Sequence, residues 1–190
     1  AIVIGSPKID VTIRPHEEKY RYRSAFVLAS NQTDIWMNRT IYVSEFLFMR
    51  VVDEINVTNR KNRLFNAIQV YYDREFWENA LSIRIVGWYK DDSPQPLNYY
   101  VHYVSSEYIG ITIGFYMYLD KYVAAKKNTF RVRISFEQSG LIDIKPYEGK
   151  IGLYLNMTPC PFLPYPIKHL SVRIISPEDA DPDPDNIFPE

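Results

Sequence analysis

The sequence predicts an all-β fold, an antiparallel β-sandwich or jelly roll of about nine or ten short strands. Its 190 residues include 16 Tyr and 10 Phe, whose bulky rings pack better on a pleated sheet than around a helix. Many segments alternate apolar and polar residues with the period of two that a strand requires, and polar or Pro-rich clusters separate them. The chain is long enough for one well-buried core, so we expect a single β domain.

Residues 108–119 are predicted to form the central strand. Ile111 and Ile113 fall on one face of this extended segment, and the whole run is mostly apolar and uncharged. Such a strand belongs deep in a sheet and not at its edge. Gly110 and Gly114 leave gaps in which an aromatic side chain of a neighbouring strand, or a tight bend, would fit.

Alternation of the same kind predicts most of the other strands. Residues 44–55 match neither template, so helix and strand both stay open there. Short helical turns are expected at 73–80 and 120–128, an extended Pro-rich crossover at 158–166, and loops at 56–62, 91–97 and 138–149. Strands are expected at 20–29, 35–43, 65–72, 81–89, 98–106, 129–136, 150–156 and 168–175.

The N-terminal segment 1–15 is expected to be separate from the sandwich domain at 16–175, which an acidic, Pro-rich tail follows at 176–190. Pro7 and Pro15 bracket its alternating part and set it apart from the next strand. Two arrangements are open: a first strand within its own sheet, or a donor strand that inserts into a neighbouring subunit. The apolar residues of this candidate donor strand are Ile2, Ile4, Ile9, Val11 and Ile13.

Charge and hydropathy argue against two classes of partner. The chain has 22 basic and 23 acidic residues, so its formal charge of -1 provides no field that would recruit nucleic acid or an anionic membrane. No apolar run approaches the roughly 20 residues that span a bilayer. We therefore expect no nucleic acid and no membrane partner, and we expect any export signal to have been removed.

Four Asn-x-Thr sequences match the N-glycosylation acceptor pattern, whereas this composition would give roughly 0.4 by chance. The alternative is that they are ordinary turn residues. The lone Cys160 cannot form an internal disulfide. We expect an extracellular or cell-surface protein with N-linked glycans at Asn31, Asn38, Asn56 and Asn156.

The sequence offers no convincing catalytic, cofactor or metal site, and we expect a protein that is not an enzyme. Cys160 lies among prolines, and no Gly-x-Ser-x-Gly elbow is present. Carboxylate pairs such as Glu75 and Glu78 are too common to indicate a glycosidase. The histidines His16, His102 and His169 lie in unrelated segments without the spacing of metal ligands. The acidic run is either a set of calcium ligands or, as we expect, a solvated tail; it consists of Asp179, Asp181, Asp183 and Asp185.

Aromatic residues could also form a sugar-binding platform, although most of these rings are expected in the core. Trp36, Trp77 and Trp88 are the candidates for such a platform.

The layout of a detachable apolar N-terminal strand, four sequons and a disulfide-free β domain resembles subunits of archaeal extracellular filaments, the thread-like and bundling pili. The resemblance implies that residues 1 to about 14 fill a groove in the next subunit by donor-strand complementation, so that the protein is its own partner in a homopolymer. It also implies that the glycans coat the outside of the filament. Head-to-tail contacts of this kind do not close and therefore generate a fibre.

Two other functions stay open at this point. One is a jelly-roll structural protein of a virion, such as a capsid, turret or spike component, and the other is a secreted carbohydrate-binding module. Deletion of the N-terminal segment separates the filament subunit from both, because only the filament subunit would stop polymerising.

Overall fold

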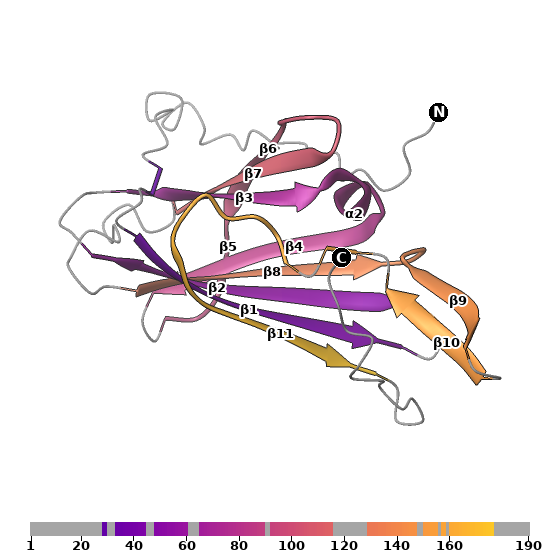
Figure 1. The fold of residues 1–190 in the computed structure, drawn as a ribbon. Coiled ribbons are helices and arrows are strands. Elements are labelled where there is room, and N and C mark those ends of the chain that lie inside the picture. The colour runs from indigo at the N-terminus through magenta and orange to yellow at the C-terminus, as the bar shows by residue number, and fades with distance from the viewer. Residues whose placement is uncertain are drawn as a thin grey trace.

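The computed structural model describes residues 28–29, 33–44, 48–60, 65–89, 92–115, 129–147, 150–155, 157–158 and 160–176. The described residues form an all-β sandwich with eleven strands and one short helix (Figure 1). The expected donor segment at 1–15, the helical turns at 120–128 and the tail from residue 177 lie outside the described residues, as does the predicted strand at 20–29 apart from Leu28 and Ala29.

The larger layer is a six-stranded sheet in the order β11-β1-β2-β8-β4-β5. All its pairs are antiparallel except β1 with β11, which is parallel. Its strands are β1 (Thr33–Val43), β2 (Met49–Asn59), β4 (Ala80–Tyr89), β5 (Gln95–Pro96), β8 (Thr129–Gln138) and β11 (Ile167–Ile175).

The smaller layer is a three-stranded antiparallel sheet in the order β3-β7-β6. A five-residue helix, α2 (Arg74–Glu78), joins it to the larger sheet, and the hairpin of β9 (Ile142–Tyr147) and β10 (Lys150–Leu155) projects beside the end of the sandwich (Figure 1). The strands of the smaller sheet are β3 (Ala67–Asp73), β6 (Asn98–Tyr103) and β7 (Tyr108–Gly114).

Strand β7 is the middle strand of the smaller sheet, which confirms the expected central position for the part of 108–119 that the structure describes. Ile109, Ile111 and Ile113 are buried on its core face, and on its other face Gly110, Thr112 and Gly114 are buried while Tyr108 is exposed. Gly110 is a gap of the expected kind, because a Cβ at this position would lie 2.3 Å from Nε2 of His102 on β6. The imidazole of His102 fills that gap.

The core lies between the two sheets and is rich in aromatic rings. Tyr72 of β3, Phe76 and Trp77 of α2, and Phe136 of β8 form one cluster, with ring centroids 5.0–6.0 Å apart. Since these rings come from both layers and from the helix, their mutual burial holds the layers together.

A buried ion pair also lies between the sheets. Nε of Arg39 is 2.7 Å from Oδ1 of Asp53, and Nη2 is 2.8 Å from Oδ2; these side chains are only 1% and 0% exposed. The hydroxyl of Tyr72 donates to Oδ2 of Asp53, and Nη1 of Arg39 donates to the carbonyl of Thr158. Burial, the largest single effect, would lower the pKa of Arg39, but the charge of Asp53 and its hydrogen bonds with the guanidinium together outweigh burial, and the pKa is raised.

The ion pair accounts for one irregularity in the pattern of residues 44–55, which the sequence leaves open between helix and strand. The part described as β2 is a strand whose residues alternate between core and solvent, but Asp53 occupies one of the core positions. A carboxylate at a buried position interrupts the alternation of apolar and polar residues from which a strand is predicted. The strand also continues to Asn59. The expectation of a loop at 56–62 is therefore wrong for residues 56–59.

The described residues contain eleven strands, including the two-residue β5, in agreement with the expected number of about nine or ten. Two further expectations need correction. Residues 142–147 of the expected loop at 138–149 form β9, which pairs with β10 although it contains Pro146. The sandwich is not purely antiparallel, because the crossover after β10 brings β11 alongside β1 in the same direction, which a tight hairpin could not do.

The crossover itself is extended and contributes few ladder bonds, as expected for its prolines. The backbone of Phe162 exchanges two hydrogen bonds of 2.8 Å with that of Tyr71. Leu163 and Tyr165 are buried, and the backbone N–H of Gln69 donates to the Tyr165 hydroxyl at 2.8 Å. The crossover therefore attaches to the outer edge of β3 on its way to β11 (Figure 1).

Alkaline pH should weaken this attachment. Burial raises the pKa of Tyr165 to about 12, while an unfolded chain ionises near pH 10. The contribution of Tyr165 to stability is therefore complete below about pH 10 and is lost as the pH rises through about 12. A spectrophotometric titration of the folded protein should show a late stage of tyrosine ionisation together with unfolding.

The variant Tyr165→Phe should reduce the amplitude of that late stage. Tyr72 stays as an internal reference, because burial raises its pKa well above the ordinary value as well. Ionisation of all tyrosines of the folded protein in one stage near pH 10 would contradict the expectation.

Helix α2 is short and capped by its neighbour in sequence. The carboxylate of Asp73 accepts hydrogen bonds from the backbone N–H groups of Glu75 and Phe76, which confirms the helical turn expected at 73–80. The described residues include no helix long and apolar enough to cross a membrane.

Candidate functional site

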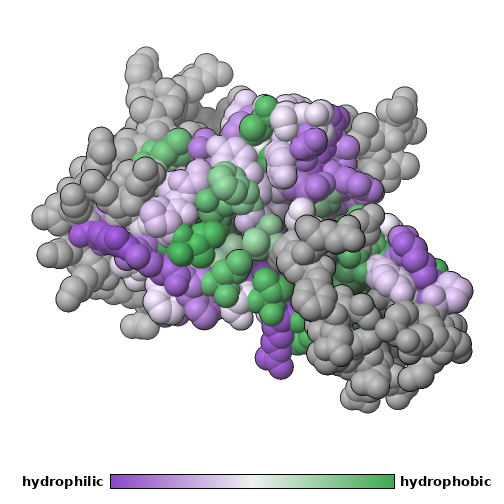
Figure 2. Space-filling view, in the orientation of Figure 1, coloured by the Kyte–Doolittle hydropathy of each residue, from purple (hydrophilic) through white to green (hydrophobic). Residues whose placement is uncertain are grey.

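Strand β11 forms one edge of the larger sheet and carries an apolar stripe that is half open to solvent. Leu170, Val172 and Ile174, named here the β11 stripe, are 43%, 40% and 40% exposed. Their register partners on β1 are Met37, Arg39 and Ile41, all of which are buried, so the stripe lies on the core side of the sheet. Figure 2 shows hydrophobic side chains gathered around the place that β11 and the preceding crossover take in Figure 1.

The two edges of the larger sheet differ in their capacity to pair with another strand. Strand β5 at the far edge is two residues long and includes Pro96, which lacks a backbone donor. Strand β11 is nine residues long and pairs with β1 along its other side. A long edge with an exposed apolar stripe is a ready template for pairing with a further strand.

The structure describes none of the residues predicted to form the donor strand. Ile2, Ile4, Ile9, Val11 and Ile13 all lie outside the described residues. Their insertion into another subunit therefore stays a prediction.

Two of the four sequons fall on the outer face of the larger sheet. Asn38 lies on β1, opposite Glu54 of β2, and Asn56 lies on β2, opposite Trp36 of β1. Both asparagines are partly exposed and share this face with their threonines, Thr40 and Thr58. Asn31 and Asn156 lie outside the described residues.

The three tryptophans occupy three different environments. Trp77 is buried in the aromatic core, Trp36 is exposed and stacks on His169 of β11 with ring centroids 5.2 Å apart, and Trp88 is partly exposed beneath the guanidinium of Arg133. The expectation that such rings go mostly to the core thus holds for Trp77, and the structure does not gather the three into one platform.

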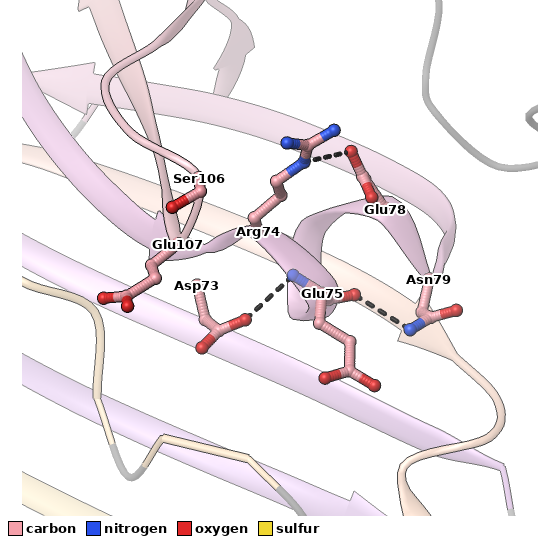
Figure 3. A pocket seen from close by; sticks show the side chains of 7 residues that line it. All are labelled: Asp73, Arg74, Glu75, Glu78, Asn79, Ser106 and Glu107. Atoms are coloured by element: carbon pink, nitrogen blue, oxygen red, sulfur yellow. Dashed lines mark hydrogen bonds and ion pairs between the residues drawn. The ribbon is translucent and has the colours of Figure 1, made fainter.

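A polar depression of about 380 Å³ lies between α2 and the turn from β6 to β7 (Figure 3). Most of its groups already serve the local structure. Asp73 caps the helix, Nε of Arg74 lies 2.7 Å from Oε1 of Glu78, and the amide of Asn79 donates to the carbonyl of Glu75. Its lining residues are Asp73, Arg74, Glu75, Glu78, Asn79, Ser106 and Glu107.

The depression brings Glu75 and Glu78 to one place, but it does not pose them as a catalytic pair. Glu78 is bonded to Arg74, and the carboxylates of Glu75 and Glu78 point apart in Figure 3. Neither of the described histidines lines it. Its geometry therefore supports a structural role, the joining of the helix to the β6–β7 turn through the 2.7 Å bond from the Arg74 N–H to the Glu107 carbonyl.

The nucleophile and base candidates are scattered. His102 lies on the outer face of the smaller sheet, His169 lies on the edge strand of the larger sheet, and Cys160 packs against the core, where burial raises the pKa of its thiol. Among the described residues, no group of three or more His, Cys, Asp and Glu could hold a metal ion. His16 and the acidic run at 179–185 lie outside those residues.

Sequence reasoning identified β11 as a strand but missed that its stripe stays exposed. The alternation of Leu170, Val172 and Ile174 is typical of a strand with one buried face, and it gives no sign that this face stays exposed. One feature of the sequence did indicate an edge strand. The face opposite the stripe carries the polar residues His169, Ser171 and Arg173, and edge strands commonly carry polar and charged side chains.

Two comparisons with known proteins, by family model and by sequence, supply no relative for this chain. No protein-family model matches it, and a search of curated proteins finds no matching sequence.

Proposed function

We propose that this protein is a structural subunit of a glycosylated extracellular filament, in which the N-terminal strand of one subunit extends the β11 edge of the next. The observation that carries the proposal is the β11 stripe, a set of three apolar side chains left 40–43% exposed on the core side of a sheet edge. In a monomer this edge would promote uncontrolled aggregation, whereas in a polymer it is covered.

The spacing of the donor segment matches the stripe. Ile9, Val11 and Ile13 recur at every second residue over five residues, as do Leu170, Val172 and Ile174. Extended chains of equal length therefore place three apolar side chains against three others on one face. The 27 residues that precede Leu28 give the donor segment enough chain to leave its own subunit.

The polar faces favour one direction of pairing. In an antiparallel register with Val11 opposite Val172, Asp10 stands opposite Arg173 and Thr12 opposite Ser171. Opposite charges and hydroxyl pairs in such cross-strand positions each contribute about 0.2–1 kcal/mol. A parallel register would place Asp10 opposite Ser171 instead, so we propose the antiparallel one.

The sequons are compatible with this assembly. Asn38 and Asn56 lie on the solvent face of the sheet, whereas the β11 stripe faces the core side. N-linked glycans on that solvent face would coat the filament and leave the stripe free. Peptide mass mapping of native material should find N-linked glycans on both asparagines. If both are unmodified, the proposed glycan coat is wrong.

Deletion of residues 1–14 should abolish polymerisation. Negative-stain microscopy and sedimentation should show filaments for the full chain and single subunits for the truncated chain. A synthetic peptide of residues 1–14 should then bind the truncated subunit, because the β11 edge is still present. As a matched control, removal of residues 177–190 takes away a segment of the same length and should leave filaments.

Disulfide trapping tests the register directly. In a Cys160→Ser background, Asp10→Cys and Arg173→Cys should give a ladder of cross-linked multimers on a denaturing gel, because residues opposed in an antiparallel pair are within disulfide reach. The pair Lys8→Cys and Arg173→Cys, shifted by two residues, should cross-link far less.

Three results would overturn the proposal. A cross-link confined to single chains would place the N-terminal strand in its own sheet. Full-length protein that stays monomeric, or that purifies only as part of a nucleocapsid-containing particle, would favour a virion protein or another secreted module.

A further inference from the structure

The outer face of the smaller sheet, which points away from the core, carries a continuous row of aromatic rings. They come from β3, from β6 and from the crossover before β11, three segments that are distant in the sequence. Two of them are largely exposed, Tyr100 at 52% and Phe162 at 62%. The set named here the aromatic face consists of Gln69, Tyr71, Tyr100, His102, Thr112 and Phe162.

The rings touch one another across the full width of the sheet. Phe162 lies 5.7 Å from Tyr71, Tyr71 meets His102 edge-on at 6.4 Å, and His102 stacks on Tyr100 at 6.0 Å with ring planes 12° apart. The result is a line of four rings at nearly even spacing, open to solvent at both ends.

The backbone holds this line in place before any ligand arrives. Gly110 of β7 lies directly beneath His102, where even a Cβ would come within 2.3 Å of the imidazole. Phe162 is held by two 2.8 Å backbone hydrogen bonds to Tyr71. A preformed surface loses little conformational entropy on binding.

Polar groups that can exchange partners lie beside the rings. The hydroxyl of Tyr71 donates to Oε1 of Gln69 at 3.1 Å, and Nε2 of Gln69 donates to Oγ1 of Thr112 at 3.5 Å. The second bond is at the limit of hydrogen-bonding distance, so it can readily be replaced by a bond to a ligand hydroxyl.

The aromatic face contains no Lys, Arg, Asp or Glu, and the next residue along this face of β3 is Asp73. A surface without basic side chains does not suit nucleic acid, sulfated polymers or phosphopeptides, whose recognition depends on Arg and Lys. Aromatic rings have electron-rich faces that attract C–H bonds, and amide and hydroxyl groups pair with ligand hydroxyls. Sugars present both features together, on the faces and the edges of their rings.

We propose that the aromatic face binds neutral oligosaccharides. Tyr100 and Phe162 each stack on the C–H face of a sugar ring, Tyr71 and His102 hold them in place from the side, and the side-chain amide of Gln69 bonds a hydroxyl at the edge of the sugar. This site is independent of the proposed filament contact, because it lies on the other sheet from the β11 stripe and requires no second subunit.

The experiment uses the full chain on an array of neutral hexose and N-acetylhexosamine oligosaccharides, with sulfated and uronic-acid saccharides as anionic counterparts. The best binder is then titrated by calorimetry. Tyr100→Ala should weaken its binding by about tenfold or more, the equivalent of losing one ring contact of about 1.4 kcal/mol. Phe162→Ala, in a different segment, should have a similar effect and covers the case in which Tyr100→Ala fails to fold.

Tyr103→Ala is the matched control. Tyr103 lies on the same strand and is 70% exposed, but it points to the opposite face, beside Arg74. Its removal should leave saccharide binding unchanged. The proposal is overturned if no neutral saccharide binds, if anionic saccharides bind better, or if Tyr100→Ala and Tyr103→Ala weaken binding equally.

Discussion

Replacing Asp53 with alanine should lower the free energy of unfolding by about 3–5 kcal/mol, because Arg39 would keep its charge in the core with no counter-charge. The hydroxyl of Tyr72 would lose its acceptor at the same time. Urea unfolding followed by tryptophan fluorescence measures the loss, since Trp77 lies in the adjacent aromatic core.

The neighbouring residue on the same strand provides a matched control. Glu54 forms a carboxylate–guanidinium bond of 2.6 Å with Arg133, but both side chains are 42% exposed on the outer face. Glu54→Ala should cost no more than about 1 kcal/mol. If the two variants lose equal stability, burial is not what makes the Arg39–Asp53 pair important.

A double variant separates the charge from the space that it fills. Arg39→Met with Asp53→Leu removes both charges and keeps apolar volume, so it should be more stable than Asp53→Ala alone. Recovery should be incomplete, because the Tyr72 hydroxyl still has no acceptor. Adding Tyr72→Phe to the double variant should restore more of the lost stability, because it removes the unpaired hydroxyl.

Phe136→Ala should destabilise the fold by a similar amount, about 3–5 kcal/mol. Its ring is fully buried and contacts Tyr72 at 5.0 Å, Phe76 at 5.1 Å and Trp77 at 5.8 Å, so its loss leaves a cavity where β8, β3 and α2 meet. Thermal unfolding followed by circular dichroism checks the size of the effect.

The same substitution at an exposed ring is the control. Phe48 precedes β2 and is about half exposed, so Phe48→Ala should change stability by no more than about 0.5 kcal/mol. Phe136→Leu should cost less than Phe136→Ala, because it leaves a smaller cavity. Equal losses for Phe136→Ala and Phe48→Ala would show that the sheets are not held together through this cluster.

The sequence predicted most strands because their faces differ in polarity. Phe130, Val132, Ile134 and Phe136 alternate with polar residues, and β8 follows that alternation with one buried and one wet face. The assignment stayed open between helix and strand where the core itself is polar. Asp53 stands among the buried residues of β2, and only the position of Arg39 on the adjacent strand reveals why a carboxylate is tolerated there.

Pairing between distant segments was beyond sequence reasoning. Nothing in residues 167–175 says that the strand lies parallel to β1, and that placement is what makes it an edge. The aromatic face is a second example, since Tyr71, Tyr100 and Phe162 become neighbours only when three segments meet. The expected gap at Gly110 is confirmed, because a glycine in a strand indicates space for a neighbouring side chain. The sequence could not show that His102 is the residue that fills this space.

The parallel pairing of β1 with β11 also sets an order of events for a newly made chain. Their partners, such as Ile35 and Ile167, are about 130 residues apart, so a very large loop must close before they meet, and topologies dominated by such distant pairings form slowly. Strand β1 can pair with β2 much earlier, because β1 ends at Val43 and β2 begins at Met49. A partly synthesised chain therefore has no β11 edge, and in the proposed filament this would delay polymerisation until the whole chain has folded.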